Sequence, residues 1–548
     1  MIAAWKIALA AGVLVAAIGW SAVASAQDAR PTVRAPAGAV QGRAEAGISA
    51  FKGIPYAAPP TGQNRWRPPA PAAAWSGVRD ASRFGAACIQ PTPGARSIYS
   101  SDLGTTSEDC LTLNVWTAST TAKAPVIVWI HGGALVTGSS KETLYDGSAL
   151  AAAGVTVVSI NYRLGVLGWL AHPDLSAESP VAISGNYGLL DQVAALQWVK
   201  TNIAAFGGDP DNVTIAGESA GGLSVMYLMA SPLARGLFHK AIAQSAYMIS
   251  TPELKQARFG APSGEEAGAA LGRRLQAPTM RVLRAMDPQA LTDSAAMGGF
   301  SSFGVVDGVV LPGQLVDVFD RGQQAQVPIL AGFNSGEIRS LRMLAPQTPT
   351  NAAAYEQTVR DRYGDLADEF LRLYPASDMG ESILATTRDA LYGWTSERLV
   401  KAQTAAGHRS FLYLFDHGYP AADSAGLRGF HASELPFMFG MLERTPPLWP
   451  KVPNTATETG LSAAMVGYWT SFARTGQPEA ANAPTWTAYD GAGAHMLFGE
   501  AAVAETGLMP GMFALHEQAV CRRRAADLAW NWNAGLASPK LTPAAGCG

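Results

Sequence analysis

The chain has 548 residues, of which 48% are hydrophobic and 15% are charged, and its formal net charge is −3. This composition is typical of a globular protein with a large apolar core. No block of lysine or arginine stands out, so the charge pattern argues against nucleic-acid binding.

The first residues have the pattern of a signal peptide. Lys6 precedes an apolar run from Ile7 to Val23, and Ala24–Ala26 matches an A-x-A cleavage site. We expect residues 1–26 to be removed, leaving a secreted or periplasmic chain that begins at Gln27 and has no stable membrane anchor. The alternative is an uncleaved anchor, but the run is short for a spanning helix and the cleavage pattern favours removal.

The four cysteines are typical of an oxidising compartment. Cys88, Cys110, Cys521 and Cys547 allow three pairings, and short loop closure favours Cys88–Cys110 and Cys521–Cys547. Four free thiols are the alternative. Neither a C-x-x-C pair nor a zinc-type spacing is present, so we expect no metal site.

Apolar runs alternate with helical patterns along the chain. Short runs at 126–130, 155–161, 213–216, 241–243, 328–333 and 411–415 predict strands. Residues 189–203 have helical spacing, and 254–300 and 345–405 are alanine-rich with helical patterns. Alternation of this kind predicts an α/β fold with a mostly parallel sheet and helices on both faces. Because we find no repeat or linker, we expect residues 27–548 to form a single domain.

Gly217–Gly221 matches G-x-S-x-G, a motif that is weak by itself. Here the strand predicted at 213–216 precedes it and a helical pattern at 222–229 follows. A strand, a tight turn and a helix form a nucleophile elbow, which would expose Ser219 at the carboxyl end of a strand. The alternative is an ordinary glycine-rich turn.

A serine hydroxyl needs a base, and the base needs an orienting acid. In this architecture the chain order is serine, acid, histidine. Glu337 follows the strand at 328–333 across a short polar turn, and His431 lies in a loop beyond the strand at 411–415. Spacing alone leaves Asp307 and His417 as rivals.

The segment His131–Ala134 follows a predicted strand and matches the H-G-G type of oxyanion loop. We expect the backbone N–H groups of Gly132, Gly133 and Ala220 to stabilise the oxyanion. Metal binding by His131 is the alternative, but no further ligands are spaced nearby.

Several motifs together resemble the type-B carboxylesterases, the family that includes the cholinesterases, over nearly the whole mature chain. They are Phe51–Ala57, Glu108–Val115, Asn161–Gly165, Phe206–Pro210, Gly217–Gly222, Gln244–Ser245, Gly429–His431 with Glu434–Pro436, and Trp469–Ala473. The resemblance implies an α/β-hydrolase fold with Glu337 as the acid, His431 as the base and a Cys88–Cys110 disulfide. It also implies that His417 is a strand-end residue and Asp307 belongs to a structural turn.

Two further positions match residues that support the histidine and the acid in related enzymes, namely Glu218 and Ser245. The chain departs from the family at Leu135, where an aromatic residue is usual and a wall of the acyl site is expected. The segment between Cys88 and Cys110 contains no tryptophan. Because related enzymes use a tryptophan there to hold a quaternary ammonium, choline esters are not expected substrates.

We therefore expect a serine esterase that acts on small-molecule carboxylic esters through an acyl-enzyme and needs no cofactor. The same machinery would also suit amide, carbamate or lactone bonds. A non-catalytic binding protein on the same fold is a more distant alternative, which the presence of all three triad residues disfavours.

Substrate charge gives a final hypothesis. If the segment after Glu337 begins a helix, Arg339 and Arg342 lie three residues apart on one face near the acid. Guanidinium groups bind carboxylates, so the enzyme could prefer polycarboxylate esters of the fumonisin type. The alternative is that both arginines are solvated or paired with nearby acids.

Overall fold

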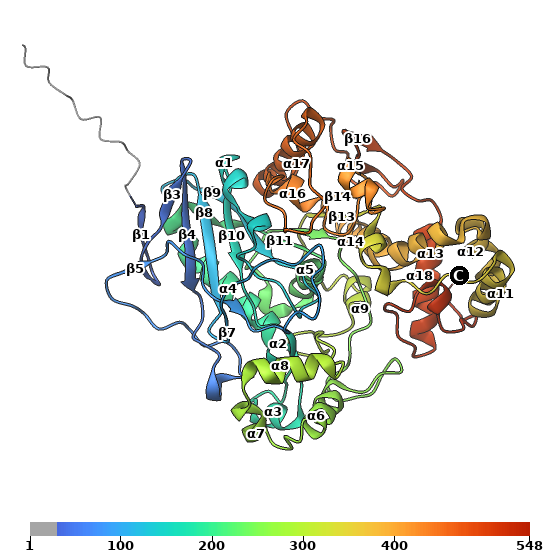
Figure 1. Cartoon of the computed structure of the whole chain (residues 1–548), viewed down its shortest axis with the longest axis horizontal. Coiled ribbons are helices and arrows are strands. Elements are labelled where there is room, and N and C mark those ends of the chain that lie inside the picture. The colour runs from blue at the N-terminus through green and yellow to red at the C-terminus, as the bar shows by residue number, and fades with distance from the viewer. Residues whose placement is uncertain (1–29, 548) are drawn as a thin grey trace, which may run out of the picture.

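The computed structural model describes residues 30–547, and the predicted signal peptide lies outside these residues. An 11-stranded sheet runs through the middle of the molecule (Figure 1). Its strands, in spatial order, are β16 (Ala502–Glu505), β15 (His495–Phe498), β14 (Ser410–Phe415), β13 (Ile329–Asn334), β12 (Lys240–Gln244), β11 (Gly208–Glu218), β9 (Ala124–Ile130), β10 (Thr156–Ile160), β8 (Thr112–Thr117), β4 (Ile48–Pro55) and β3 (Arg43–Glu45).

The central part of this sheet is parallel, from β10 through β9, β11, β12, β13 and β14 to β15. Antiparallel strands complete both edges, with β8, β4 and β3 on one side and β16 on the other. The predicted α/β class with a mostly parallel sheet is therefore confirmed. Because the central strands are parallel, their carboxyl ends meet at one edge of the sheet, where ligand sites of such folds lie.

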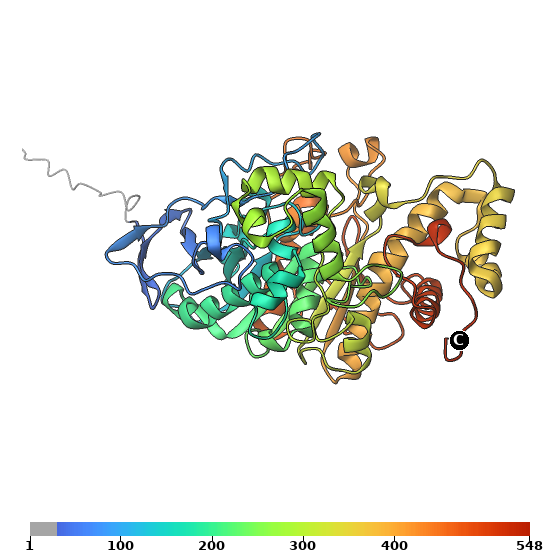
Figure 2. The ribbon, with the colours of Figure 1, turned by 90° about the horizontal axis from the view of Figure 1, so that it is seen from below.

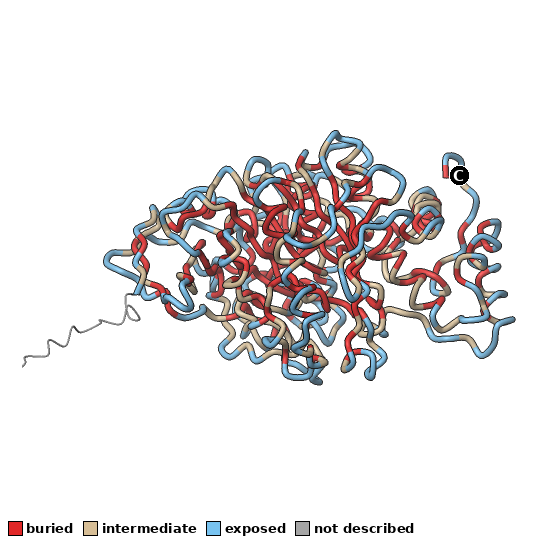
Figure 3. The backbone as a smooth tube through the Cα atoms, turned by 90° about the horizontal axis from the view of Figure 1, so that it is seen from above, coloured by how far each residue is buried: buried red, intermediate tan, exposed pale blue. Residues whose placement is uncertain are grey.

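Helices cover both faces of the sheet, and strand β9 shows why. Val126, Val128 and Ile130 pack into one hydrophobic cluster, whereas Ile127 and Trp129 pack into another on the opposite face. Since successive side chains of a strand point to opposite faces, a strand buried on both sides is continuously apolar. Figure 3 shows the resulting concentration of buried residues through the centre of the molecule.

The helices fall into sets by the cluster that they join. One face of the sheet is covered by α4 (Tyr187–Asn202), α5 (Ala220–Ala230), α9 (Leu315–Asp320) and α14 (Trp394–Ala405). The other face is covered by α1 (Ser148–Ala152), α15 (Pro420–Ser424), α16 (Leu435–Met438) and α17 (Ala456–Thr475).

Two groups of helices lie beyond the sheet and have cores of their own. The first contains α2 (Gly165–Trp169), α3 (Pro173–Glu178), α6 (Gly264–Arg274), α7 (Met280–Ala285) and α8 (Pro288–Met297). The second contains α11 (Ala352–Tyr363), α12 (Ala367–Leu373), α13 (Met379–Arg388) and α18 (Met512–Ala525), and it forms the end of the molecule that holds the C-terminus (Figures 1 and 2). The helical patterns at 254–300 and 345–405 contribute to these groups.

Both cysteine pairs that short loop closure favours are disulfide-bonded in the structure, Cys88 to Cys110 and Cys521 to Cys547. Cys88 ends the short strand β6 (Ala87–Cys88), which pairs with β7 (Thr106–Ser107). A separate small sheet contains β1 (Thr32–Ala35), β2 (Gly38–Gln41) and β5 (Val78–Asp80). Within residues 30–547, no helix has the length and apolar character needed to cross a bilayer.

Candidate active site

Ser219 occupies the single position between the end of β11 and the start of α5. Its backbone angles are φ 57° and ψ −120°, a strained conformation for a residue with a side chain. The flanking glycines are required by close backbone contacts. A Cβ atom on Gly217 would lie 2.8 Å from the carbonyl oxygen of Ile130, and one on Gly222 would lie 2.7 Å from that of Gln244. This geometry is the predicted strand–turn–helix elbow.

Glu337 begins the short helix α10 (Glu337–Ser340), just beyond the carboxyl end of β13. The side chain is completely buried. Its Oε1 accepts a hydrogen bond from the backbone N–H of Asn334 at 2.9 Å, and its Oε2 contacts Nδ1 of His431. The carboxylate is therefore fixed at both oxygens, with one of them on the predicted base.

His431 lies in the loop between α15 and α16, and this loop is bonded directly to the one that carries the acid. The backbone N–H of Gly336 donates to the carbonyl oxygen of Gly429 at 2.7 Å, and Asn334 Nδ2 donates to that of Phe430 at 2.7 Å. Two segments that are about a hundred residues apart in sequence are thus held together next to the imidazole.

The second ring nitrogen of His431 faces Glu218. The distance from His431 Nε2 to Glu218 Oε1 is 3.1 Å. Within residues 30–547, no hydrogen bond links Ser219 Oγ to His431. Hydrogen bonds of catalytic groups are often long without substrate and tighten only in the substrate complex. The structure thus brings Ser219, its neighbour Glu218, His431 and Glu337 to one site.

The predicted oxyanion loop packs directly on this serine. A Cβ atom on Gly132 would lie 2.9 Å from the carbonyl oxygen of Glu218 and 3.2 Å from Ser219 Cβ. Gly133 has φ 101°, and Ala134 and Leu135 follow with φ 57° and 61°. Ala134 is exposed, whereas Leu135 is buried. Three consecutive residues with positive φ turn the backbone sharply beside Ser219.

His131 supports this loop through its ring. Its ring stacks on Tyr162 with centroids 4.6 Å apart, and Nδ1 lies 2.8 Å from the carbonyl oxygen of Gly132. Burial lowers the pKa of His131 to about 4, so the ring is neutral at physiological pH. Among the residues that the structure describes, no group of three His, Cys, Asp or Glu side chains could hold a metal ion.

Three buried carboxyl groups surround His431, and their electrostatics are coupled to it. Burial raises the pKa of Glu218 far above its usual value, against the opposing effect of His431. Burial alone would lower the pKa of His431, but the carboxylates of Glu218 and Glu337 outweigh this effect and raise it. Both shifts favour a proton held between Glu218 and His431.

The third carboxyl group, Glu434, is one that motif reasoning left without a role. It accepts hydrogen bonds from Gln244 Nε2 at 2.9 Å and Asn334 Nδ2 at 2.6 Å. Burial raises its pKa to about 7, partly offset by the Asn334 hydrogen bond. The signal in the sequence was the Glu434–Pro436 motif, which contributed only to the resemblance.

Ser245, the other predicted supporting residue, follows β12 with φ 44° and is buried. Its backbone N–H donates to the carbonyl oxygen of Gly332 at 2.8 Å. Its hydroxyl has no hydrogen-bond partner within the described part of the chain. Ser245 therefore lies in the buried surroundings of the site without a bond to the triad residues.

The two rival residues lie elsewhere in the structure. Asp307 Oδ1 accepts hydrogen bonds from three successive backbone N–H groups, those of residues 309–311, at 2.9, 2.7 and 3.1 Å. His417 lies just beyond β14, with Nε2 3.4 Å from Glu458 Oε1. These positions agree with a structural turn and a strand-end residue.

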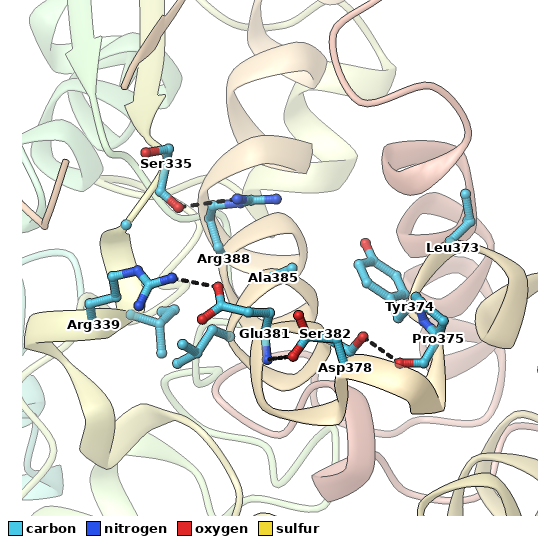
Figure 4. Close-up of a pocket in the computed structure, with 13 residues that line it drawn as sticks. Ser335, Arg339, Leu373, Tyr374, Pro375, Asp378, Glu381, Ser382, Ala385 and Arg388 are labelled. Carbon is cyan, nitrogen blue, oxygen red and sulfur yellow. Dashed lines mark hydrogen bonds and ion pairs between the residues drawn. The ribbon is translucent and has the colours of Figure 1, made fainter. Parts of the chain in front are cut away.

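The arginine hypothesis assumed a helix that continues through Arg342, and this assumption was wrong. α10 ends at Ser340, and Arg342 belongs to a separate 3-10 turn (Arg342–Leu344). Arg339 lines a pocket of about 210 Å³ and pairs there with Glu381 of α13 (Figure 4). Arg342 is exposed, and no ion pair involves it within residues 30–547. The two arginines therefore do not form one binding face.

Comparison with known proteins decides the family. Residues 29–508 match the model of the carboxylesterase family. The chain belongs to the carboxylesterase family. It is 36% identical to the fumonisin B1 esterase of Sphingopyxis macrogoltabida, covering 88% of this chain and 89% of that one. It is 37% identical to the para-nitrobenzyl esterase of Bacillus subtilis, covering 82% and 91%.

Solved structures agree. A carboxylesterase of Geobacillus stearothermophilus matches with a TM-score of 0.75 and 34% identity over 89% of this chain and all of that one. A pNB esterase matches with a TM-score of 0.76 and 34% identity over 89% and 99%. The resemblance noted in the sequence is confirmed. The chain thus has the α/β-hydrolase fold and is a carboxylic ester hydrolase, and its esterase relatives act on small-molecule esters.

Proposed function

We propose that this carboxylesterase works through a Ser219–His431–Glu337 triad and an acyl-enzyme. The observation that carries the proposal is the position of Ser219 at a strained elbow, directly after Glu218, whose Oε1 lies 3.1 Å from Nε2 of the His431 that is paired with Glu337. Ser219 Oγ attacks the acyl carbon of the ester as His431 Nε2 takes its proton. The tetrahedral intermediate collapses, the C–O bond breaks, and the proton passes to the departing alcohol.

In the second half of the reaction, His431 takes a proton from water, and the resulting hydroxide attacks the acyl carbon. The acid product leaves and Ser219 recovers its proton. Glu337 holds the imidazole and stabilises its charged form. The negative oxygen of both intermediates accepts hydrogen bonds from the N–H groups of Gly132, Gly133 and Ala220. A carboxylic acid and an alcohol are the only products, and no cofactor takes part.

The test is Ser219→Ala with Ser224→Ala as the matched control. Ser224 is a buried serine one turn along α5, and its Oγ accepts a hydrogen bond from Gln192 at 3.0 Å. Ser219→Ala should lower kcat for p-nitrophenyl butyrate by about 10⁴–10⁶-fold. Ser224→Ala should stay within about tenfold of the parent, because it loses only a structural hydrogen bond. Near-normal turnover by Ser219→Ala would exclude this mechanism.

We further propose that the enzyme is exported and matures near Gln27. The signal pattern at residues 1–26 supports this proposal, as do the two disulfides, which form in oxidising compartments. N-terminal sequencing of the protein from a periplasmic or culture fraction should begin within a few residues of Gln27. A chain that retains residues 1–26 would contradict cleavage.

A carboxylated ester is a second candidate for the substrate class. Arg342 is the observation that favours it, because an exposed guanidinium beyond the acid helix is available for a carboxylate. The similarity to a fumonisin B1 esterase is consistent with this choice. Arg339 is left out because Glu381 already pairs with it.

The experiment compares a neutral ester with a carboxylated ester of similar size in Arg342→Ala and in a control, Arg360→Ala. Arg360 is an exposed arginine on α11 that pairs with Asp368. If Arg342 binds the substrate, its loss should reduce kcat/KM for the charged ester alone by about tenfold to a hundredfold. Equal effects on both esters would show that Arg342 does not bind the substrate and is only a solvated surface residue.

A further inference from the structure

The segment enclosed by the Cys88–Cys110 disulfide contacts both parts of the proposed machinery. At one end, Gln90 binds Gly138, which follows the oxyanion loop in sequence, through a pair of hydrogen bonds. The N–H of Gly138 donates to Gln90 Oε1 at 3.0 Å, and Gln90 Nε2 donates to the carbonyl oxygen of Gly138 at 3.1 Å. Gly138 in turn packs on Gly132, since a Cβ atom there would lie 2.7 Å from the carbonyl oxygen of Gly132.

Further along the segment, Tyr99 bonds to both the acid helix and the base. Its phenol oxygen lies 2.7 Å from Ser340 Oγ and 3.0 Å from the carbonyl oxygen of His431. A carbonyl oxygen only accepts, so Tyr99 donates to His431 and the Ser340 hydroxyl donates to Tyr99. Ser340 ends the helix that Glu337 begins. One phenol therefore joins the segments that carry the acid and the base.

The surroundings of Tyr99 hold it in this position. Its ring packs edge-to-face on Trp449, with centroids 5.8 Å apart, and on the imidazole of His431 at 6.4 Å. Desolvation raises the pKa of the phenol well above its ordinary value, so the phenol keeps its proton at neutral pH and can donate. Tyr99 is half-buried, and loss of these partners would cost free energy, which favours the bonded arrangement.

The segment itself is also anchored to α8. Gln289 of α8 donates through Nε2 to the carbonyl oxygen of Gln90 at 2.9 Å. Asp293, one turn later, accepts from the backbone N–H of Thr92 at 2.7 Å and from its hydroxyl at 2.9 Å. The disulfide joins the two ends of the segment, and these hydrogen bonds fix it to α8, so it is not a free loop.

We propose that Tyr99 is a positioning residue for ester hydrolysis, which holds the backbone of His431 in place against Glu337, and that Gln90 does the same for the oxyanion loop. The inference rests on the proposed triad. It assigns the disulfide-closed segment a role in the chemical step, because Tyr99 bonds to the backbone of His431 and Gln90 bonds to Gly138, which packs on Gly132. Small displacements of a catalytic group reduce the rate of the chemical step more than substrate binding.

The test is Tyr99→Phe, which keeps the ring and removes the hydrogen bonds. The matched control is Tyr355→Phe on α11, where a buried phenol donates to the carbonyl oxygen of Tyr374 at 3.0 Å. With p-nitrophenyl butyrate, Tyr99→Phe should lower kcat about tenfold and leave KM within about twofold. Tyr355→Phe should leave both within about twofold, since it loses the same kind of bond far from the site.

Activity must be expressed per active site, counted by the burst of p-nitrophenol from a p-nitrophenyl dialkyl phosphate. A kcat per counted site within twofold of the parent would overturn the proposal, even if fewer sites were counted. If Tyr99→Phe does not fold, Ser340→Ala removes one of the two bonds and should lower kcat per site about threefold; an unchanged value would overturn the proposal equally. Failure of the triad itself would look different, because the parent enzyme would then give no burst.

Gln90→Ala tests the other end of the disulfide-closed segment with the same assay. It removes both bonds to Gly138 but no atom of the site, so kcat per counted site should fall by about tenfold with little change in KM. If kcat stayed within twofold, the contact of Gln90 with Gly138 would be structural, and that half of the proposal would be wrong.

Discussion

At the scale of single residues, the environment of His431 determines how the activity depends on pH. The imidazole has Glu337 at Nδ1 and Glu218 at Nε2. Although burial lowers its pKa, these carboxylates raise it above the ordinary value of about 6.5. A base must be neutral to accept a proton, and a group with a raised pKa becomes neutral only at higher pH. The rising limb of kcat/KM should therefore lie above the ordinary imidazole pKa.

Glu218→Gln should move this limb to lower pH by about one unit or more, because it removes one of the negative charges that stabilise the imidazolium. Glu142→Gln is the control. Glu142 is a half-buried carboxyl whose pKa desolvation also raises, but its contacts are Ser139 and Ser101 rather than His431. The measurement is kcat/KM against pH for the two variants and the parent. A limb that stays in place in Glu218→Gln would show that Glu218 does not control the base.

Glu337→Gln should lower kcat by about 10³–10⁴-fold with little change in substrate binding, because the imidazolium loses its stabilising charge. Asp307→Asn should instead lower thermal stability and leave kcat near that of the parent, since Asp307 accepts three backbone hydrogen bonds in a turn. Steady-state kinetics and melting curves separate the two effects. A larger loss of kcat in Asp307→Asn would reverse the assignment of the acid.

At the scale of elements, the features that could be predicted from the sequence are those that depend on a local pattern of residues. The apolar run at 126–130, buried on both faces, and the glycines around Ser219 have signatures within a few residues, and both are found as expected. Spacing alone could not choose between Glu337 and Asp307, and only the family resemblance favoured Glu337. The contacts of Glu218, Glu434 and Tyr99 depend on segments that meet only in the folded chain.

In the segment after Glu337, by contrast, a local pattern gave a wrong prediction. The spacing of Arg339 and Arg342 matched a helical face, but α10 stops after four residues and the chain turns into a 3-10 segment. Short helices are not stable by themselves, so tertiary contacts decide where they end. Here Ser340 is bonded to Tyr99, and Arg339 is paired with Glu381.

The oxyanion loop gives a prediction at this scale. Gly132→Ala should lower kcat by about 10²-fold or more, because the added Cβ would press on the carbonyl oxygen of Glu218 and on Ser219 Cβ, and so displace the N–H donors. The control is Gly380→Ala, because a Cβ atom added to Gly380 meets nothing within 4 Å. Gly154 would not serve, because its φ of 91° would strain any residue with a side chain. Steady-state kinetics of Gly132→Ala and Gly380→Ala provide the comparison. Equal activity in the two variants would show that Gly132 is not part of the site.

At the scale of the whole molecule, the Cys521–Cys547 disulfide should contribute to stability rather than to catalysis. Cys521–Cys547 ties the last described residues to α18, in the group of helices beyond the sheet. Replacing both cysteines by serine should destabilise the protein by about 3 kcal/mol and lower its Tm, while kcat stays within about twofold. Calorimetry and steady-state kinetics measure the two effects. A large loss of kcat with an unchanged Tm would contradict this separation.

The central claim is that the ester is cleaved through a covalent bond to Ser219. It is tested most directly by mixing the enzyme with a p-nitrophenyl dialkyl phosphate, digesting it and locating the adduct by peptide mass spectrometry. The account predicts one dialkylphosphoryl group per enzyme on the peptide that contains Ser219, with activity lost in proportion to labelling, and no adduct on that peptide in Ser219→Ala. Complete inactivation with the adduct on another residue, or full labelling of Ser219 with activity retained, would contradict it.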